Sequence, residues 1–244
     1  MSYLTYISDN NLTEVVKSVL DVGIKRKKEA EKKFTKNVID PFGSLFEAAA
    51  FSVDHETWKN SETIRQCQKT LQNHVGELHQ KILGYATGWK DLGVGNVVDL
   101  ICEEQQIIAE VKNKYNTVTG GKLADQYYSF ERLIMPKASN YRGYKAYFVN
   151  IIPKRPRRSD ELFVPSDKDK GAKCPENENI RKIDGASFYT LVTGEQDALK
   201  NFYNVLPTVI EDIFNNYYKD EKLSIKDKGL FSEYFTLAYE NNHE

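Results

Sequence analysis

The chain has 244 residues, enough for one large domain or two small ones, and 40% of them are hydrophobic, so a sizeable core can be buried. The net charge of −1 excludes a polycation, so any contact with nucleic acid must come from local basic clusters. The three cysteines are widely spaced and the four histidines include no HExxH motif, which argues against a disulfide framework and a zinc site.

The N-terminal sequence has no basic stretch followed by an apolar run, so we expect no secretory signal. No segment reaches the roughly 18 uninterrupted apolar residues of a membrane span. We therefore expect a cytoplasmic protein that does not contact a membrane.

Three helices are expected in the N-terminal third. The first covers residues 12–33, and its charged run KRKKEAEKK is typical of a solvated helix face. A short apolar helix over 44–51 follows, with Ser44 as its expected N-cap. The clearest helix is 61–83, which Ser61 can cap, because its apolar residues recur three and four apart.

The hydrophobic period then changes to that of a sheet. Residues 96–101 and 106–112 are rich in Val and Ile and flank a turn-sized polar segment, which predicts a β-hairpin. The later elements are a helix over 120–137, a strand over 144–152, a long loop over 153–180, a short strand over 180–183 and a helix over 195–214 that Pro207 should kink. No element is predicted after residue 219. This order indicates a mixed α/β domain with helices on a modest central sheet.

Charged residues interrupt the two apolar strands of this hairpin. Asp99 lies in VVDLI, and Glu110 and Lys112 lie in IIAEVK. Residues two apart on a strand share a face, so Glu110 and Lys112 point together, and a hairpin can place Asp99 across from Glu110. Buried charges need a partner or a metal, and Mg²⁺ takes one or two carboxylates together with water and phosphate oxygens. The cluster therefore suits phosphodiester hydrolysis, with Lys112 orienting water or neutralising developing charge.

An acidic residue two positions before a lysine is not specific by itself. The same spacing occurs at Glu31/Lys33 and at Asp220/Lys222, but those pairs lie in charged, solvated stretches. A purely structural ion-pair cluster at a sheet edge would use the same residues as a catalytic one. The sequence context alone leaves both interpretations open, a catalytic site and a structural ion-pair cluster.

At these residues the chain resembles the PD-(D/E)XK nuclease superfamily, with Val98 where members often carry a proline. Three longer stretches are similar to a narrower group, the Type II restriction endonucleases that cut GGNCC sites. They are QKTLQNHVGELHQKILG, VVDLICEEQQIIAEVKNKYNT and IDGASFYTLVTG. The resemblance runs from about residue 40 to residue 215, and the three stretches in this order are more specific than the short motif.

The resemblance implies a restriction-endonuclease-like core, with a central mixed sheet flanked by helices and a helical part before it. It also implies Mg²⁺ held by Asp99, Glu110 and the carbonyl of Val111. Members often carry a further acidic residue on the helix before the hairpin. Glu77 matches by position, although it could equally be a surface carboxylate, and Glu47 is the second choice.

Two segments are candidates for DNA contact. Lys114, Tyr115 and Asn116 follow the second strand and could reach phosphates, although a solvated strand end would look the same. The densest basic run of the sequence lies at the start of the long loop. Its side chains could read guanine bases or contact the DNA backbone, and the alternative is a solvated charged loop. Its charged members are Lys154, Arg155, Arg157 and Arg158.

The sequence therefore predicts one endonuclease domain over 1–244, with a mainly helical part at 1–90, a catalytic core at 91–215 and a tail at 216–244. We expect a prokaryotic homodimer that cuts double-stranded DNA at a short palindrome and leaves 5′-phosphates, because two-fold protein symmetry matches a two-fold site. A companion DNA methyltransferase would protect the host. The rivals are a structure-selective repair or recombination nuclease of the same superfamily and a non-catalytic DNA-binding protein.

Overall fold

The computed structural model describes residues 2–36, 38–93, 95–219 and 228–240. Its contacts divide the chain into two compact units, unit 1 with Met1–Thr13 and His79–Glu244, and unit 2 with Glu14–Leu78. The elements in chain order are α1 (Asp9–Lys33), the 3-10 helix η1 (Phe34–Lys36), α2 (Pro41–Ala50), α3 (His55–Gly84), β1 (Trp89–Asp91), β2 (Leu100–Cys102), β3 (Ile107–Lys114), α4 (Gly120–Ile134), β4 (Lys145–Ile152), β5 (Asp160–Leu162), β6 (Ser166–Asp167), β7 (Ala172–Lys173), β8 (Ile180–Asp184), α5 (Gly185–Thr193), α6 (Ala198–Tyr217) and α7 (Lys228–Tyr239). No helix among these residues is both long and apolar enough to cross a membrane.

Unit 1 is built on a six-stranded sheet with the order β1-β2-β3-β4-β8-β5. The pairs β1–β2, β2–β3 and β5–β8 are antiparallel, whereas β3–β4 and β4–β8 are parallel. The carboxyl ends of β3, β4 and β8 therefore meet at one edge of the sheet, where open α/β sheets bind their ligands. The expected mixed α/β fold with a central mixed sheet and helices is confirmed.

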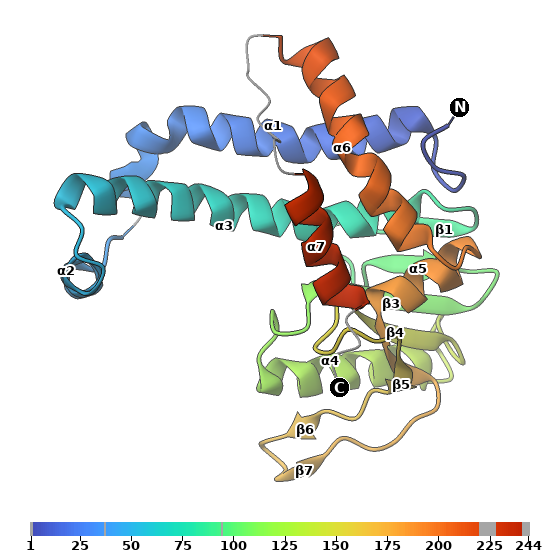
Figure 1. The fold of residues 1–244 in the computed structure, drawn as a ribbon. Helices are drawn as coiled ribbons and strands as arrows, with labels where there is room; N and C mark the ends of the chain where they lie inside the picture. The colour runs from blue at the N-terminus through green and yellow to red at the C-terminus, as the bar shows by residue number, and fades with distance from the viewer. Residues whose placement is uncertain (1, 37, 94, 220–227, 241–244) are drawn as a thin grey trace. The chain divides into compact units, whose positions relative to one another are not determined.

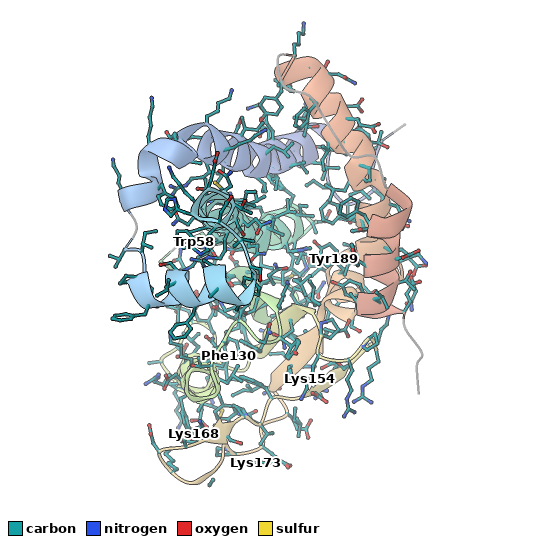
Figure 2. All side chains as sticks on the ribbon, turned by 60° about the vertical axis from the view of Figure 1, so that its left-hand side comes forward. Trp58, Phe130, Lys154, Lys168, Lys173 and Tyr189 are labelled. Atoms are coloured by element: carbon teal, nitrogen blue, oxygen red, sulfur yellow. The ribbon has the colours of Figure 1, made fainter. Side chains whose placement is uncertain are left out.

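Helices cover both faces of this sheet. On one face, Tyr127 and Phe130 of α4 join a buried cluster that includes Ile108 and Phe148 of the central strands. On the other face, Phe188 of α5 lies edge-on to Trp89, with ring centroids 5.5 Å apart, and also contacts Tyr147. Figure 2 labels Phe130 and Tyr189, one residue from each of these two layers.

Unit 2 is helical. Its parts of α1 and α3 run side by side (Figure 1), and the Cys67 thiol on α3 donates a hydrogen bond to the carbonyl of Arg26 on α1, 3.6 Å away. Phe34 lies edge-on to Trp58, with centroids 6.4 Å apart. The N-terminal helical part expected from the sequence is therefore present.

The helix starts differ from the sequence predictions. Helix α2 begins at Pro41, and Asp40 caps it by accepting a hydrogen bond from the Phe42 N–H, so Ser44 is not the cap. Proline suits the first helical position because its missing N–H would have no partner there. Helix α3 begins at His55, six residues before Ser61, and the Asp54 carboxylate accepts from the Thr57 N–H.

The strands also differ from the predictions in detail. Strand β2 is shorter than the predicted strand over 96–101, because it covers only Leu100–Cys102, and β1 was not predicted. The predicted loop over 153–180 contains the short strands β5, β6 and β7. Helix α6 continues through Pro207, and α7 lies in the tail for which the sequence predicted nothing.

Candidate active site

Asp99 lies at a β-bulge directly before β2. Leu100 is the register partner of Ala109, yet the N–H of Asp99 also donates to the Ala109 carbonyl at 3.0 Å. Two residues therefore face one residue on β3, whereas the sequence suggested a regular hairpin with Asp99 across from Glu110. Bulges redirect side chains and are common beside active sites.

The bulge aims the Asp99 carboxylate at β3. Its Oδ2 accepts a hydrogen bond of 2.7 Å from the N–H of Val111. The N–H and C=O of one strand residue point to the same side, so the Val111 carbonyl also points toward Asp99. The structure thus brings a carboxylate and a backbone carbonyl together on the antiparallel side of β3.

Glu110 and Lys112 point to the same face of β3, as the strand period predicts. The Lys112 ammonium donates to Glu110 Oε1 at 2.5 Å, and the two side chains are 30% and 15% exposed. This ion pair is only partly screened by water, so its charges interact more strongly than those of a surface pair.

The charged forms of both carboxylates are electrostatically unfavourable at this site. Burial raises the pKa of Asp99 above its ordinary value, although the Val111 hydrogen bond and Lys112 oppose that shift. Burial also raises the pKa of Glu110, and the negative charge of Asp99 raises it further. The two acids are therefore close enough to repel each other, and a bound cation would relieve that repulsion.

The oxygen atoms of this site fit Mg²⁺ better than a metal that takes all of its ligands from protein side chains. Among the described residues, no three His, Cys, Asp or Glu side chains gather as a metal cluster. Mg²⁺ does not need one, since it is usually held by one or two carboxylates and keeps several waters. Asp99, Glu110 and the Val111 carbonyl provide that kind of all-oxygen set.

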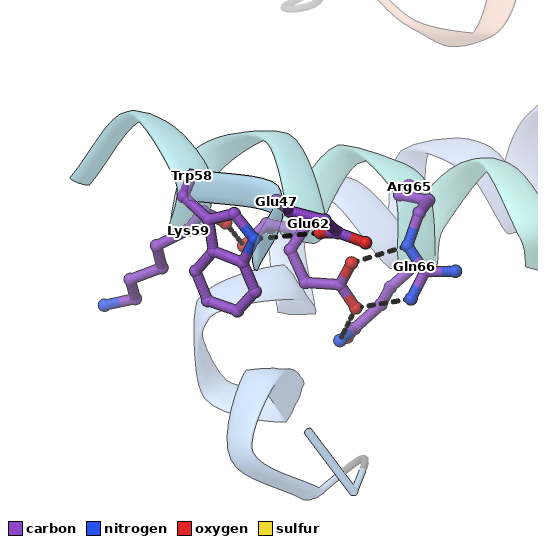
Figure 3. A network of polar contacts seen from close by, with 7 residues as sticks. Glu47, Trp58, Lys59, Glu62, Arg65 and Gln66 are labelled. Atoms are coloured by element: carbon purple, nitrogen blue, oxygen red, sulfur yellow. Dashed lines mark hydrogen bonds and ion pairs between the residues drawn. The ribbon is translucent and has the colours of Figure 1, made fainter. Parts of the chain in front are cut away.

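The two candidates for an additional acid lie in unit 2. The Glu77 carboxylate lies 3.3 Å from Nδ1 of His74 and is 40% exposed. Glu47 accepts a 3.0 Å hydrogen bond from the Trp58 indole (Figure 3). Asp99 and Glu110 belong to unit 1, so the role of Glu77 stays a prediction.

The segment after β3 is exposed beside the parallel strand β4. Lys114 ends β3, and the N–H of Tyr115 donates to the Ile152 carbonyl at 3.1 Å. The Tyr115 side chain is 41% exposed, and Asn116 is exposed as well. Their positions at the carboxyl edge of the sheet are compatible with DNA contact, which remains a prediction.

The basic run after β4 divides into two parts. Lys154, Arg155 and Arg157 line a pocket of about 220 Å³ at the ends of β4 and β8, and Figure 2 labels Lys154. The Arg158 guanidinium instead donates to the carbonyls of Ala186 and Gln196 and to Thr190 Oγ1. Arg158 therefore holds α5 and the turn after it, a structural role that the sequence did not indicate.

Comparisons with known proteins assign the chain to a family. The family model of the Eco47II restriction endonuclease matches residues 4–215. The chain is 56% identical to the Type II restriction enzyme Eco47II of Escherichia coli over 239 residues, which are 98% of this chain and 100% of the relative. The chain belongs to the Eco47II restriction endonuclease family. It is therefore a Type II restriction endonuclease, an enzyme that acts on double-stranded DNA.

A second relative within the same class is more distant. The Type II restriction enzyme Sau96I of Staphylococcus aureus is 30% identical over 244 residues, which cover 98% of this chain and 91% of the relative. The Eco47II family match includes every residue considered for the site, from Glu47 to Arg158, and begins earlier than the resemblance seen in the sequence.

Sequence reasoning missed a polar row across the three parallel strands of this endonuclease. Lys112, Asn150 and Asp184 are register partners on β3, β4 and β8, so their side chains share one face. Asn150 and Asp184 are 3% and 2% exposed. A single asparagine in the apolar run AYFVNII was the available signal for Asn150, and the Asp-Gly pair at the start of α5 was the signal for Asp184.

The two buried members of this row differ in their hydrogen bonds. Asp184 caps α5, because its carboxylate accepts from the N–H groups of Ser187 and Ser159. Asn150 Oδ1 is buried without a hydrogen-bond partner in the part of the chain that the structure describes. An unpaired buried polar atom is costly, which singles out Asn150 as a functional candidate beside Lys112.

Proposed function

We propose that this Type II endonuclease hydrolyses phosphodiester bonds at GGNCC sites with Mg²⁺ and leaves 5′-phosphates, as a member of the PD-(D/E)XK superfamily. The observation that carries the proposal is the convergence of Asp99, Glu110 and Lys112 at the edge where the sheet strands end. The specificity for GGNCC comes from the resemblance of the three longer sequence stretches. The catalytic core proposed at 91–215 falls entirely within unit 1.

In this proposal, Asp99, Glu110 and the Val111 carbonyl hold the cation. When bound, Mg²⁺ would polarise the phosphoryl group and lower the pKa of a coordinated water. The Val111 N–H fixes the orientation of Asp99, and the bulge keeps that carboxylate turned toward β3. The buried backbone of β2 and β3 would hold these oxygen ligands of the cation in position before DNA binds.

Lys112 acts at the reacting phosphate. Its ammonium is paired with Glu110. Once Glu110 serves the cation, Lys112 can turn to orient the attacking water and to neutralise charge that develops on the phosphate oxygens. Glu77 is the proposed additional acid, and Glu47 is the second choice.

DNA contact in this proposal involves the exposed residues around the same edge. The proposed contacts are Lys114, Tyr115, Asn116, Lys154, Arg155 and Arg157. Arg158, which the sequence also suggested, is not among them, because its guanidinium holds α5. A homodimer would place two such sites on the two strands of a palindrome, and a companion methyltransferase would protect the host genome.

The decisive experiment is digestion of a plasmid that contains mapped GGNCC sites, with Mg²⁺ or with EDTA. We expect discrete fragments whose ends map to GGNCC only with Mg²⁺. Lys112→Ala should lower the cleavage rate about 10²–10³-fold, the usual cost of removing one stabilising group from a transition state. Lys90→Ala is the matched control, because Lys90 pairs with Glu103 at an exposed position on β1 and should leave the rate unchanged.

Two other outcomes would overturn the proposal. A smear, or cleavage only at junctions and damaged sites, would favour the structure-selective nuclease. DNA binding without cleavage by both wild type and Lys112→Ala would favour a non-catalytic binding protein.

A further inference from the structure

Helix α2 carries an apolar stripe on its exposed side. Phe42, Leu45, Phe46 and Ala49 recur three and four residues apart, which places them on one face of the helix. Phe42, Leu45 and Phe46 are 71–76% exposed, and α2 contains no buried residue. An exposed apolar stripe of this kind marks an interaction surface.

The polar face of α2 is turned toward its own unit. At about 100° per residue, Glu47 lies roughly 150° from the centre of the apolar stripe. Its carboxylate accepts the hydrogen bond from the Trp58 indole on α3 (Figure 3). A surface helix normally packs its apolar face against its own core and turns its polar face to water. Helix α2 does the reverse, so its apolar stripe is oriented for a partner outside unit 2.

Unit 2 also has an apolar groove of about 520 Å³ along α1 and α3. Gly23 and Ala30 contribute from α1, and Ile64, Cys67 and Leu71 contribute from α3. Ile64 is 57% exposed in this groove. A stripe and a groove on the same unit can satisfy each other reciprocally when two copies meet about a two-fold axis.

We propose that α2 of one copy inserts its apolar stripe into the α1–α3 groove of a second copy, and that the second copy does the same in return. This inference rests on the homodimer in the proposed function and names its surface. The large side chains of the stripe, together with Phe51, which is 73% exposed, present about 500 Å² of apolar area. Reciprocal insertion would bury two such stripes, about 1,000 Å², and up to the same area of the two grooves, a total of up to about 2,000 Å² that reaches the range of a stable interface.

The chemistry of the stripe favours a protein partner over DNA. No cation lies among Phe42, Leu45, Phe46 and Ala49, whereas binding to a DNA backbone depends on lysine and arginine. Lys27 and Lys59 also line the groove, and the stem of Lys27 can cover an inserted aromatic ring while its charge stays in water.

Sedimentation of the full chain across a concentration series tests the surface. We expect a dimer for wild type and a dimer dissociation constant at least about 30-fold higher for Phe46→Glu and Leu45→Glu, as for truncation of an interface hot spot. Leu237→Glu is the matched control, because Leu237 on α7 is also exposed, at 55%. Circular dichroism should show folded protein in every case. A wild type that stays monomeric, or a Phe46→Glu variant that dimerises normally, would overturn the inference.

Oxidative cross-linking tests the groove as the occupied site. Phe46→Cys should form a covalent dimer through Cys67 of the other copy, and the additional change Cys67→Ser should abolish it. A covalent dimer that persists without Cys67 would mean that two α2 helices pair directly, which contradicts the groove. Plasmid cleavage by wild type is measured separately, so a dimer without cleavage would reject only the proposed function.

Discussion

Asn150 lies beside Lys112 in the register of the parallel strands β4 and β3, and its buried Oδ1 has no hydrogen-bond partner within the described residues. The Lys112 ammonium donates to Glu110. If Glu110 binds a cation during cleavage, Lys112 loses that partner. Asn150 Oδ1 is then a neighbouring acceptor that could hold the ammonium near the reacting phosphate.

Replacing Asn150 by leucine, which has a similar shape, should therefore slow cleavage without unfolding the enzyme. A hydrogen bond to a charged group is worth about 1.5–3 kcal/mol, so the single-turnover rate should fall about 10–150-fold. The rate and the KM for DNA are measured separately, and KM should stay unchanged, because Asn150 would act through Lys112 and not through DNA binding.

The double variant distinguishes this role from a general effect on packing. When Lys112 is already alanine, Asn150→Leu should cause no further loss of rate, because the interaction that it removes is gone. An equal loss in both backgrounds would show that Asn150 acts independently of Lys112.

Sequence patterns predicted the hairpin and the acidic pair because both depend on short-range periodicity. The apolar residues of β2 and the Ile and Val residues of β3 identify the strands, and the period of two places Glu110 and Lys112 on one face. The bulge at Asp99 was not predictable in this way. It depends on how the backbone of Asp99 divides its hydrogen bonds between Ala109 and Leu92, and no side-chain pattern reports that division.

The polar row was missed for a different reason. Lys112, Asn150 and Asp184 are far apart in the chain, and only the parallel pairing of β3, β4 and β8 brings them together. The sequence indicated strands but not their order in the sheet. The helix caps were misjudged because Asp40 and Asp54 are as suitable for capping as Ser44 and Ser61, and both helices begin at the earlier of the two candidates.

Stability between pH 4 and 7 should depend on His79, whose half-buried ring packs against Tyr189 of α5 and Phe202 of α6. Its Nδ1 lies 2.9 Å from the Tyr189 hydroxyl, and burial lowers the pKa of His79 to about 4. His79 binds a proton near pH 6.5 in the unfolded chain but only near pH 4 in the folded chain. The free energy of unfolding that the neutral, folded His79 contributes is therefore complete above pH 6.5 and is lost as the pH falls toward 4. The loss amounts to about 3 kcal/mol, or about 6–12 °C in Tm.

Thermal denaturation of His79→Gln across this pH range checks the prediction. The variant should show a shallower fall of Tm on acidification than wild type. His74→Gln should retain the wild-type slope, because His74 is a partly exposed histidine on the same helix. Parallel slopes for wild type and His79→Gln would contradict the assignment.

Gly185 should tolerate no side chain, because α5 begins against the backbone of β4. A Cβ at this position would overlap the Ile151 carbonyl oxygen and would lie 2.6 Å from the Cα of Ile151. Gly185→Ala should therefore destabilise the protein by about 1–3 kcal/mol, as overpacking does. Gly120→Ala at the start of α4 is the control, since nothing lies within 4 Å of its Cβ position, and a Tm measurement compares the two.

Arg157 and Arg158 are adjacent in sequence, yet alanine substitutions should affect different properties. Arg157 lines the pocket at the ends of β4 and β8. Arg157→Ala should therefore weaken DNA binding and reduce the dependence of log K for DNA binding on log salt concentration by about 1, while Tm stays constant. Arg158 donates to two carbonyls and to Thr190 beside α5, so Arg158→Ala should lower Tm by leaving these acceptors without that donor. Fluorescence anisotropy with Ca²⁺ in place of Mg²⁺ and thermal denaturation separate the two effects. If Arg158→Ala changes only the salt slope, its guanidinium serves DNA and not the fold.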